Sequence, residues 1–232
     1  MSNDASSPGG VGGPPAQTSS HRGWHHRGYL PHFDAPGMWQ SITYRLADAL
    51  PIAVVRKLAE ELGIADARAG RPRPQGKAFT DDDPDDERRR AYRKKVEAWL
   101  DAGQGACHLR DPSIAEIVQH NLLHHAGERY HLGAWVVMPN HVHVLIRIQE
   151  SWPLDRVVHG WKSFTAKRII TALALRPPLW QGEYWDRYIR DEAHWLRAKQ
   201  YIEENPVAAR LVKKPQEWKW SSASFAESST SA

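Results

Sequence analysis

Short runs of β-forming residues, several of them alternating with polar ones, predict four strands in this chain. Successive side chains of a strand point to opposite faces of a sheet, so alternation indicates that one face is buried. The predicted strands are residues 38–46, 129–138, 141–148 and 183–190. Pro139 and Asn140 separate the second strand from the third, and such a short connection predicts a hairpin.

Apolar residues recur at helical spacing between and after these strands. Asp111 is a plausible N-cap and Pro112 a first helical residue, and Asp191 is a plausible N-cap for the last helix. The predicted helices are residues 51–63, 88–101, 111–127, 153–174 and 191–206. With the insertion after the first strand and the last helix set aside, the order is βαββαβ. This order predicts an α+β, ferredoxin-like antiparallel sheet with helices on one face, to which the last helix is added at the C-terminal end.

The composition changes at both ends of this predicted domain. Residues 1–37 are rich in Gly, Pro, Ser and His and are expected to form a disordered tail. Residues 38–223 form the predicted domain, with a charged insertion at about 60–110 that contains an acidic block at 81–87. The acidic block is expected to be solvated. Residues 224–232 are expected to be disordered, and the segment just before them to be peripheral.

Charge and hydropathy limit the class of protein. The 232 residues carry a net charge of +4 and a pI near 9.2, which is compatible with a polyanionic partner without requiring one. The single cysteine excludes an intramolecular disulfide. No apolar run approaches the roughly 18 residues of a membrane helix, and the first residues lack the hydrophobic core of a secretion signal. A cytoplasmic protein without a membrane partner is expected.

Two histidines interrupt the otherwise apolar strand 141–148. His141 and His143 share one face of the strand at about 7 Å from each other, and imidazoles at that spacing can converge on one metal ion. The opposite face carries Val142, Val144, Ile146 and Ile148. Taken alone, this pattern is as readily explained by two polar residues on the outer face of an amphipathic strand.

The last predicted helix offers a third ligand and a nucleophile. Tyr201 and Asn205 are four residues apart and therefore lie on one helical face, which His194 and Arg197 share. An amide oxygen is a hard ligand suited to Mg²⁺ or Mn²⁺. A tyrosine on such a face could attack a phosphate if a metal polarised that phosphate and a nearby arginine favoured the phenolate. Alternatively, the Tyr201 ring simply packs against the sheet.

Four ordered motifs carry a resemblance to a known family. The motifs are "WVVMPNHVHVL", "WKSFTAKRI", "YWDRYIRDEAHW" and "YIEENPVAARLV". They closely resemble the REP-associated tyrosine transposases, which are single-tyrosine transposases of the HUH (His–hydrophobic–His) endonuclease class. The resemblance runs from about Met38 to Ala223, and neither the stretch 60–110 nor the tail 1–37 is part of the family's minimal domain.

The resemblance implies an activity and a role for each matching residue. Members cut and rejoin single-stranded DNA at hairpin-forming, REP-like elements, which is the chemistry of DNA transposition. His141, His143 and Asn205 would hold Mg²⁺ or Mn²⁺, and imidazole ligands suit Mn²⁺ better. Tyr201 would form a 5′-phosphotyrosine link and release a free 3′-OH. The active unit would be a monomer or a homodimer.

Single-stranded or hairpin DNA would meet basic and aromatic side chains. The candidates for phosphate contacts are Lys162, Lys167, Arg168, Arg187, Arg190 and Arg197, and those for base stacking are Trp180, Trp185 and Trp195. Two other functions remain open at this point. One is a non-catalytic relative that binds hairpin DNA or represses transcription, and the other is a metal-dependent hydrolase of small phosphoesters.

Overall fold

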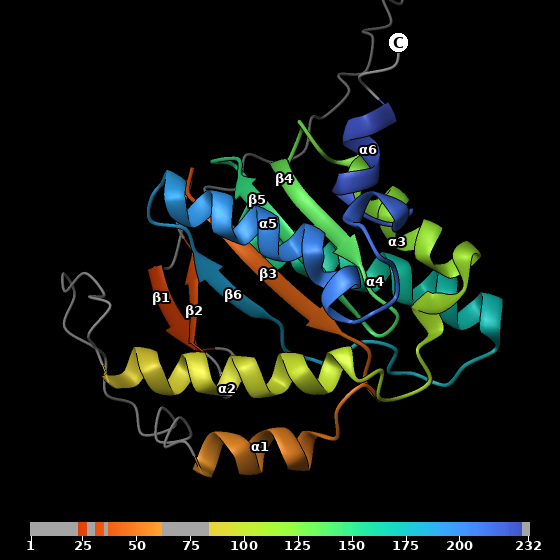
Figure 1. Cartoon of the computed structure of the whole chain (residues 1–232), viewed down its shortest axis with the longest axis horizontal. Helices are drawn as coiled ribbons and strands as arrows, with labels where there is room; N and C mark the ends of the chain where they lie inside the picture. The colour runs from red at the N-terminus through yellow and green to blue at the C-terminus, as the bar shows by residue number, and fades with distance from the viewer. Residues whose placement is uncertain (1–22, 27–30, 35–36, 62–83, 229–232) are drawn as a thin grey trace, which may run out of the picture.

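The computed structural model describes residues 23–26, 31–34, 37–61 and 84–228. A four-stranded antiparallel sheet forms its centre (Figure 1). Its strands are β3 (Trp39–Arg45), β4 (Tyr130–Val137), β5 (His141–Ile148) and β6 (Trp185–Tyr188), in the order β4-β5-β3-β6. Helix α3 (Pro112–His124) is the last helix between β3 and β4, and α4 (Leu154–Leu173) connects β5 to β6. This connectivity and strand order confirm the predicted ferredoxin-like sheet.

Helices cover both faces of the sheet (Figure 1). The pair α3 and α4 packs on one face, and α5 (Glu192–Ala208) crosses β4 and β5 on the other. The alternation predicted for β5 is confirmed, because Val142, Val144, Ile146 and Ile148 join the larger core. Leu145 points the other way and packs in a smaller core with Ile202 of α5. The face of β5 that carries the histidines is therefore buried as well.

The predicted N-caps of α3 and α5 are confirmed. The Asp111 carboxylate accepts a hydrogen bond from the Ser113 backbone amide at 2.8 Å, and the Asp191 carboxylate accepts one from the His194 amide at 2.7 Å. Each cap satisfies an amide that the first helical turn leaves without a partner. The second cap fixes where α5 begins, and with it the positions of the residues further along that helix.

Part of the insertion forms helices. Helix α1 (Ile52–Glu61) is followed by residues 62–83, which lie outside the described ranges, and then by α2 (Pro84–Asp101). Helix α2 runs along one end of the sheet, with α1 on its far side (Figure 1). Tyr92, Val96 and Leu100 recur at helical spacing and are buried in the larger core. This half of the insertion therefore belongs to the folded domain.

Both ends of the chain depart from their predictions. Within the expected tail, β1 (Gly23–His26) and β2 (Pro31–Asp34) pair as an antiparallel ribbon, and β2 lies beside β6. The composition hid this ribbon because its pairing depends on the neighbouring sheet. At the other end, α6 (Ser222–Ser228) replaces expected disorder.

The segment before α6 is not peripheral. Trp220 is buried, and its carbonyl accepts a hydrogen bond from the Val137 amide at 2.8 Å. The Ser222 hydroxyl accepts one from the Trp135 amide at 3.2 Å. In the described ranges, no helix has the length and apolar character needed to cross a membrane.

Candidate active site

The two histidines of β5 lie between the sheet and α5. Strand β5 pairs with β3 on one side and β4 on the other, with Arg45 opposite His141 and Thr43 opposite His143. Both histidine side chains are 1% exposed, and their ring centroids are 4.7 Å apart. Strand pairing on both sides holds the two imidazoles at a fixed separation on the α5 side of the sheet.

Each imidazole is oriented by a bond at its Nδ1 atom. His141 Nδ1 lies 2.7 Å from the Asn140 side-chain oxygen, and His143 Nδ1 lies 2.7 Å from the Thr43 hydroxyl. The Asn140 amide nitrogen donates to the carbonyls of Leu100 and Gln104 at 3.1 and 3.0 Å, so its oxygen must face His141. The His141 proton therefore sits on Nδ1, and its Nε2 atom carries a lone pair.

Both rings are neutral at physiological pH. Burial lowers the pKa of His143 to about 3. Burial also lowers the pKa of His141 well below its ordinary value, with further contributions from His143 and Arg45, while the adjacent Asn205 side chain opposes the shift. Neutral imidazoles are the form that binds metal ions.

Asn205 completes a set of three buried acceptor atoms. Its side chain is 2% exposed, and its Oδ1 atom has no hydrogen-bond partner. The Nε2 atoms of His141 and His143 are likewise buried without partners. Buried acceptors are rarely left without a donor or an ion. Three of them together, one amide oxygen and two nitrogens of imidazoles that Asn140 and Thr43 orient, suit a divalent cation.

The third candidate metal ligand is an amide oxygen, not a carboxylate oxygen. Within the described ranges, no group of three or more His, Cys, Asp or Glu residues is placed to hold a metal ion. The third ligand of the candidate site would therefore come from outside those four residue types.

Tyr201 lies at the edge of the same cluster. Its ring centroid is 5.5 Å from that of His143, with the planes at 78°, and the side chain is 39% exposed. Glu97, Asp101 and Asn205 are near enough to its hydroxyl to act on the pKa of that group. The structure thus brings together all four residues that the sequence analysis assigned to metal binding and nucleophilic attack.

The charges around Tyr201 differ from the prediction. Burial raises the pKa of the Tyr201 hydroxyl, and the nearby carboxylates of Glu97 and Asp101 raise this pKa further. The Asn205 side chain acts in the opposite direction and lowers this pKa. The expectation that an arginine favours the phenolate is therefore wrong, because α2 places two acidic residues at this position.

Two of the predicted DNA contacts have structural roles. Trp180 is 5% exposed, packs edge-on against Tyr44 at 4.9 Å and donates its indole N–H to the Thr165 hydroxyl, so its prediction as a stacking platform is wrong. The Lys162 ammonium bonds to the carbonyls of Gln181 and Gly182. Burial lowers the pKa of Lys162 to about 8. Lys162 therefore ties α4 to the segment that leads into β6.

The other two candidate tryptophans also have aromatic neighbours. Trp185 stacks on Tyr92 of α2 at 5.4 Å, and Trp195 meets Trp39 of β3 edge-on at 5.7 Å. Both side chains are half-buried. Their rings join α2 and α5 to the sheet.

Three of the predicted basic residues gather near the start of α5. Burial lowers the pKa of His194 to about 4, and the charges of Arg187, Arg197 and Arg190 contribute while Asp191 opposes them. Arg190 and Arg197 are exposed, and Arg187 is half-buried. These side chains form a basic cluster on the α5 side of the molecule, the side that carries Tyr201.

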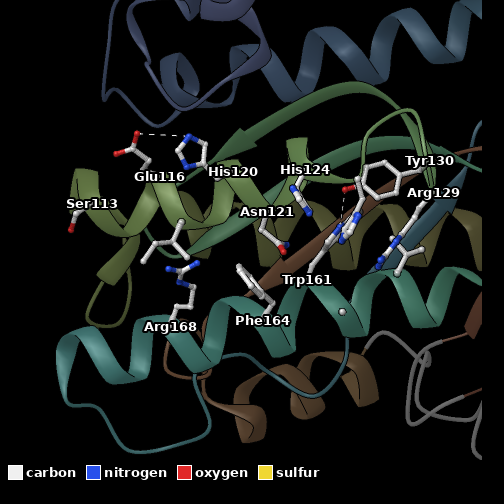
Figure 2. Close-up of a pocket in the computed structure, with 14 residues that line it drawn as sticks. Ser113, Glu116, His120, Asn121, His124, Arg129, Tyr130, Trp161, Phe164 and Arg168 are labelled. Atoms are coloured by element: carbon white, nitrogen blue, oxygen red, sulfur yellow. Dashed lines mark hydrogen bonds and ion pairs between the residues drawn. The ribbon is translucent and has the colours of Figure 1, made fainter. Parts of the chain in front are cut away.

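Arg168 lies elsewhere. It lines a cleft of about 740 Å³ between α3 and α4, where its guanidinium group sits 5.4 Å from the exposed ring of Phe164 (Figure 2). The cleft also contains His120, Asn121 and Arg129 and none of the four candidate active-site residues. Exposed Lys167 is next to Arg168 on α4. The six basic candidates therefore do not form one continuous surface.

Comparison with known proteins finds sequence similarity to transposases. Residues 113–205 match the model of the family described as "Transposase IS200 like". That range contains His141, His143, Tyr201 and Asn205. The chain is similar to a REP-associated tyrosine transposase from Escherichia coli (strain K12), with 28% identity over 109 residues.

The extent of these matches is limited. The alignment with the E. coli REP-associated tyrosine transposase covers 44% of this chain and 64% of the relative, which is less than two thirds of the relative's length. A solved structure of a REP-associated tyrosine transposase bound to a REP hairpin has 18% identity and a TM-score of 0.49, over 85% of this chain and 81% of that one. Helix α2 lies outside the range matched by the transposase family model.

Several residues next to the candidate site were not predicted from the sequence. Asn140 was assigned only to the turn, although its position next to His141 was a usable signal. Thr43 comes from a strand 100 residues away from its partner His143. Glu97 and Asp101 share one face of α2, but nothing in the sequence indicated that this face meets Tyr201.

Proposed function

We propose that this protein is a metal-dependent single-stranded DNA endonuclease and strand transferase of the transposase type. It would act on hairpin-forming, REP-like DNA through a 5′-phosphotyrosine intermediate. One observation carries the proposal: three buried acceptor atoms without partners, His141 Nε2, His143 Nε2 and Asn205 Oδ1, lie beside the hydroxyl of Tyr201. The relationship to REP-associated tyrosine transposases supports the choice of DNA as the substrate.

His141, His143 and Asn205 would hold the metal ion. Mg²⁺ or Mn²⁺ bound there would supply positive charge to a phosphate at the site. Asn140 and Thr43 keep the two imidazoles in a metal-binding orientation through their Nδ1 atoms. Loss of one such partner typically weakens metal binding about 10- to 100-fold.

Tyr201 would be the nucleophile. Its oxygen would attack the scissile phosphorus, form a 5′-phosphotyrosine bond and displace the 3′-oxygen. This transesterification conserves the phosphodiester bond energy, so rejoining needs no additional energy source. The Tyr201 side chain is partly exposed on α5, where a DNA strand could approach it.

The test is a covalent-adduct assay with a labelled single-stranded hairpin and Mn²⁺. The wild-type protein should give a labelled protein–DNA band on a denaturing gel, and Tyr201→Phe should bind the DNA without giving that band. Tyr188→Phe, which alters a tyrosine of β6, is the matched control and should behave as the wild type. DNA binding without any wild-type adduct would instead indicate a non-catalytic binding protein. Turnover of a small phosphoester without an adduct would indicate a hydrolase.

A further inference from the structure

The cleft between α3 and α4 has the size of a small-molecule site. Its volume of about 740 Å³ falls within the range of about 300–1,000 Å³ that such sites occupy. Helices α3 and α4 cover one face of the sheet and α5 covers the other (Figure 1), and none of the four candidate active-site residues lines the cleft. A ligand bound there would therefore be separate from the candidate active site.

Two buried N–H groups in this cleft lack hydrogen-bond partners. The Asn121 side chain is 8% exposed, and its Nδ2 atom has no acceptor. Arg129 Nε is also buried without a hydrogen bond, and the Glu128 carboxylate is 3.9 Å away from it. Buried donors are rarely left unpaired in folded proteins. A ligand with acceptor atoms at both positions would satisfy them.

The charges that line the cleft favour an anion. Arg129 and Arg168 lie at opposite ends of the cleft (Figure 2), and the Arg129 guanidinium is held 4.3 Å from the ring of Trp152. Glu116 is the one acidic residue among the described residues that line the cleft, and its carboxylate is 3.9 Å from His120 Nε2. Guanidinium groups bind phosphate with two parallel hydrogen bonds, so a phosphate suits this lining.

Between the two arginines, the cleft presents an aromatic ring and an amide. Phe164 is 48% exposed and extends from α4 toward α3, while Asn121 extends from α3 toward α4 (Figure 2). An exposed aromatic ring can stack on a nucleobase, and an asparagine amide can hydrogen-bond to a base edge such as that of adenine. Gly160, one helical turn before Phe164, also lines the cleft, and a side chain there would meet no atom within 4 Å of its Cβ. The open space beside Gly160 leaves room for a sugar.

We propose that this cleft binds a nucleotide, with the base between Phe164 and Asn121 and the terminal phosphate at Arg129. Because Arg129 Nε is buried, a phosphate at the end of a ligand can reach it, whereas a phosphate within a polynucleotide carries a sugar on each side and is too bulky. A free nucleoside monophosphate and the 5′-phosphorylated end of a DNA strand share this terminal group. The inference does not depend on the endonuclease activity proposed above.

The experiment is isothermal titration calorimetry of deoxyadenosine monophosphate into the full-length protein. EDTA is included, so that phosphate cannot bind through a metal ion at His141 and His143. The nucleotide should bind at one site, and deoxyadenosine and inorganic phosphate should each bind at least about 10-fold more weakly, because each lacks one half of the contacts.

Three substitutions in the cleft test the assigned contacts. Phe164→Ala removes the stacking ring and should weaken binding about 5- to 100-fold. Asn121→Ala removes one hydrogen bond to the base and should weaken binding about 5-fold. Gly160→Leu fills the open space without displacing a neighbour of its Cβ and should prevent binding. Melting temperatures identify any variant that fails to fold.

Arg156→Gln is the matched control, since it removes an exposed arginine of α4 that does not line the cleft and should leave the affinity unchanged. Absence of binding by the wild-type protein would overturn the inference. Affinities unchanged in folded Phe164→Ala and Gly160→Leu would also overturn it, since they would place the nucleotide elsewhere. Inorganic phosphate binding as tightly as the nucleotide would exclude a base site.

Competition with single-stranded oligonucleotides distinguishes the two sources of the ligand. Displacement of the nucleotide by a 5′-phosphorylated strand, but not by the same strand with a 5′-hydroxyl, would identify a DNA end as the ligand. Displacement by neither strand would identify a free nucleotide. Equal displacement by both strands would overturn the assignment of a terminal phosphate to Arg129. Because no adduct or metal is measured, failure here leaves the proposed endonuclease activity standing.

Discussion

Asn140 offers a test of how the metal site is held together. Its side chain is 1% exposed and makes three hydrogen bonds, two donated to the carbonyls of Leu100 and Gln104 and one accepted from His141. Asn140→Ala removes all three. It leaves the His141 Nδ1–H without an acceptor and releases the end of α2 from the turn.

The size of the effect follows from these bonds. Each hydrogen bond contributes about 1 kcal/mol net, so losing three should lower the free energy of unfolding by about 3 kcal/mol. For a domain of this length such a loss corresponds to a decrease of about 6–12 °C in melting temperature. Loss of the side chain that orients His141 should also weaken metal binding about 10- to 100-fold.

Two measurements separate these consequences. Thermal unfolding of the metal-free protein by circular dichroism reports the stability loss, and Mn²⁺ titration followed by electron paramagnetic resonance reports affinity without requiring activity. Asn121→Ala is the matched control, because Asn121 of α3 is 8% exposed and its amide nitrogen has no partner. Unchanged Mn²⁺ affinity in Asn140→Ala would refute the assignment of His141 as a ligand oriented by Asn140.

Three further substitutions test other parts of the structure. Thr43→Val removes the 2.7 Å bond to His143 with little change in shape, and Mn²⁺ affinity should fall about 10-fold or more in the same titration, whereas no change would contradict an orienting role. The pKa of His194 is about 4 in the folded protein, below its unfolded value of about 6.5. The free energy of unfolding should therefore decrease as the pH falls from about 6.5 toward 4. His194→Gln should reduce this decrease when the melting temperature is measured as a function of pH. Gly133→Ala would place a Cβ 2.8 Å from the Trp39 ring, so melting temperature should fall unless that ring moves freely.

The sheet and its flanking helices were predictable because local signals agreed with the final packing. The boundaries of β5 match their prediction, and both aspartate caps are where the sequence placed them. The four candidate active-site residues were also predictable, because the H-x-H pair and the Tyr-x-x-x-Asn pair each follow the period of their own element. Their approach to one another required only that α5 cover the histidine face.

The remaining features depend on contacts between distant segments. Trp180 is apolar and aromatic, and its sequence neighbours do not distinguish a buried ring from an exposed one. The acidic environment of Tyr201 arises from α2, which is 100 residues or more before it in the chain. The ribbon of β1 and β2 was hidden by a composition typical of disorder.

The chain end has a consequence for self-association. Strand β4 is at one edge of the sheet, and edge strands with free backbone groups can add a strand from another molecule. Here Ser221 forms an antiparallel bridge with Val136, and the flanking amides of Trp135 and Val137 bond to Ser222 and Trp220. A second copy could extend the sheet along this stretch only if residues 220–222 first detached from β4. A truncation that removes these residues should therefore favour fibrous or domain-swapped assemblies.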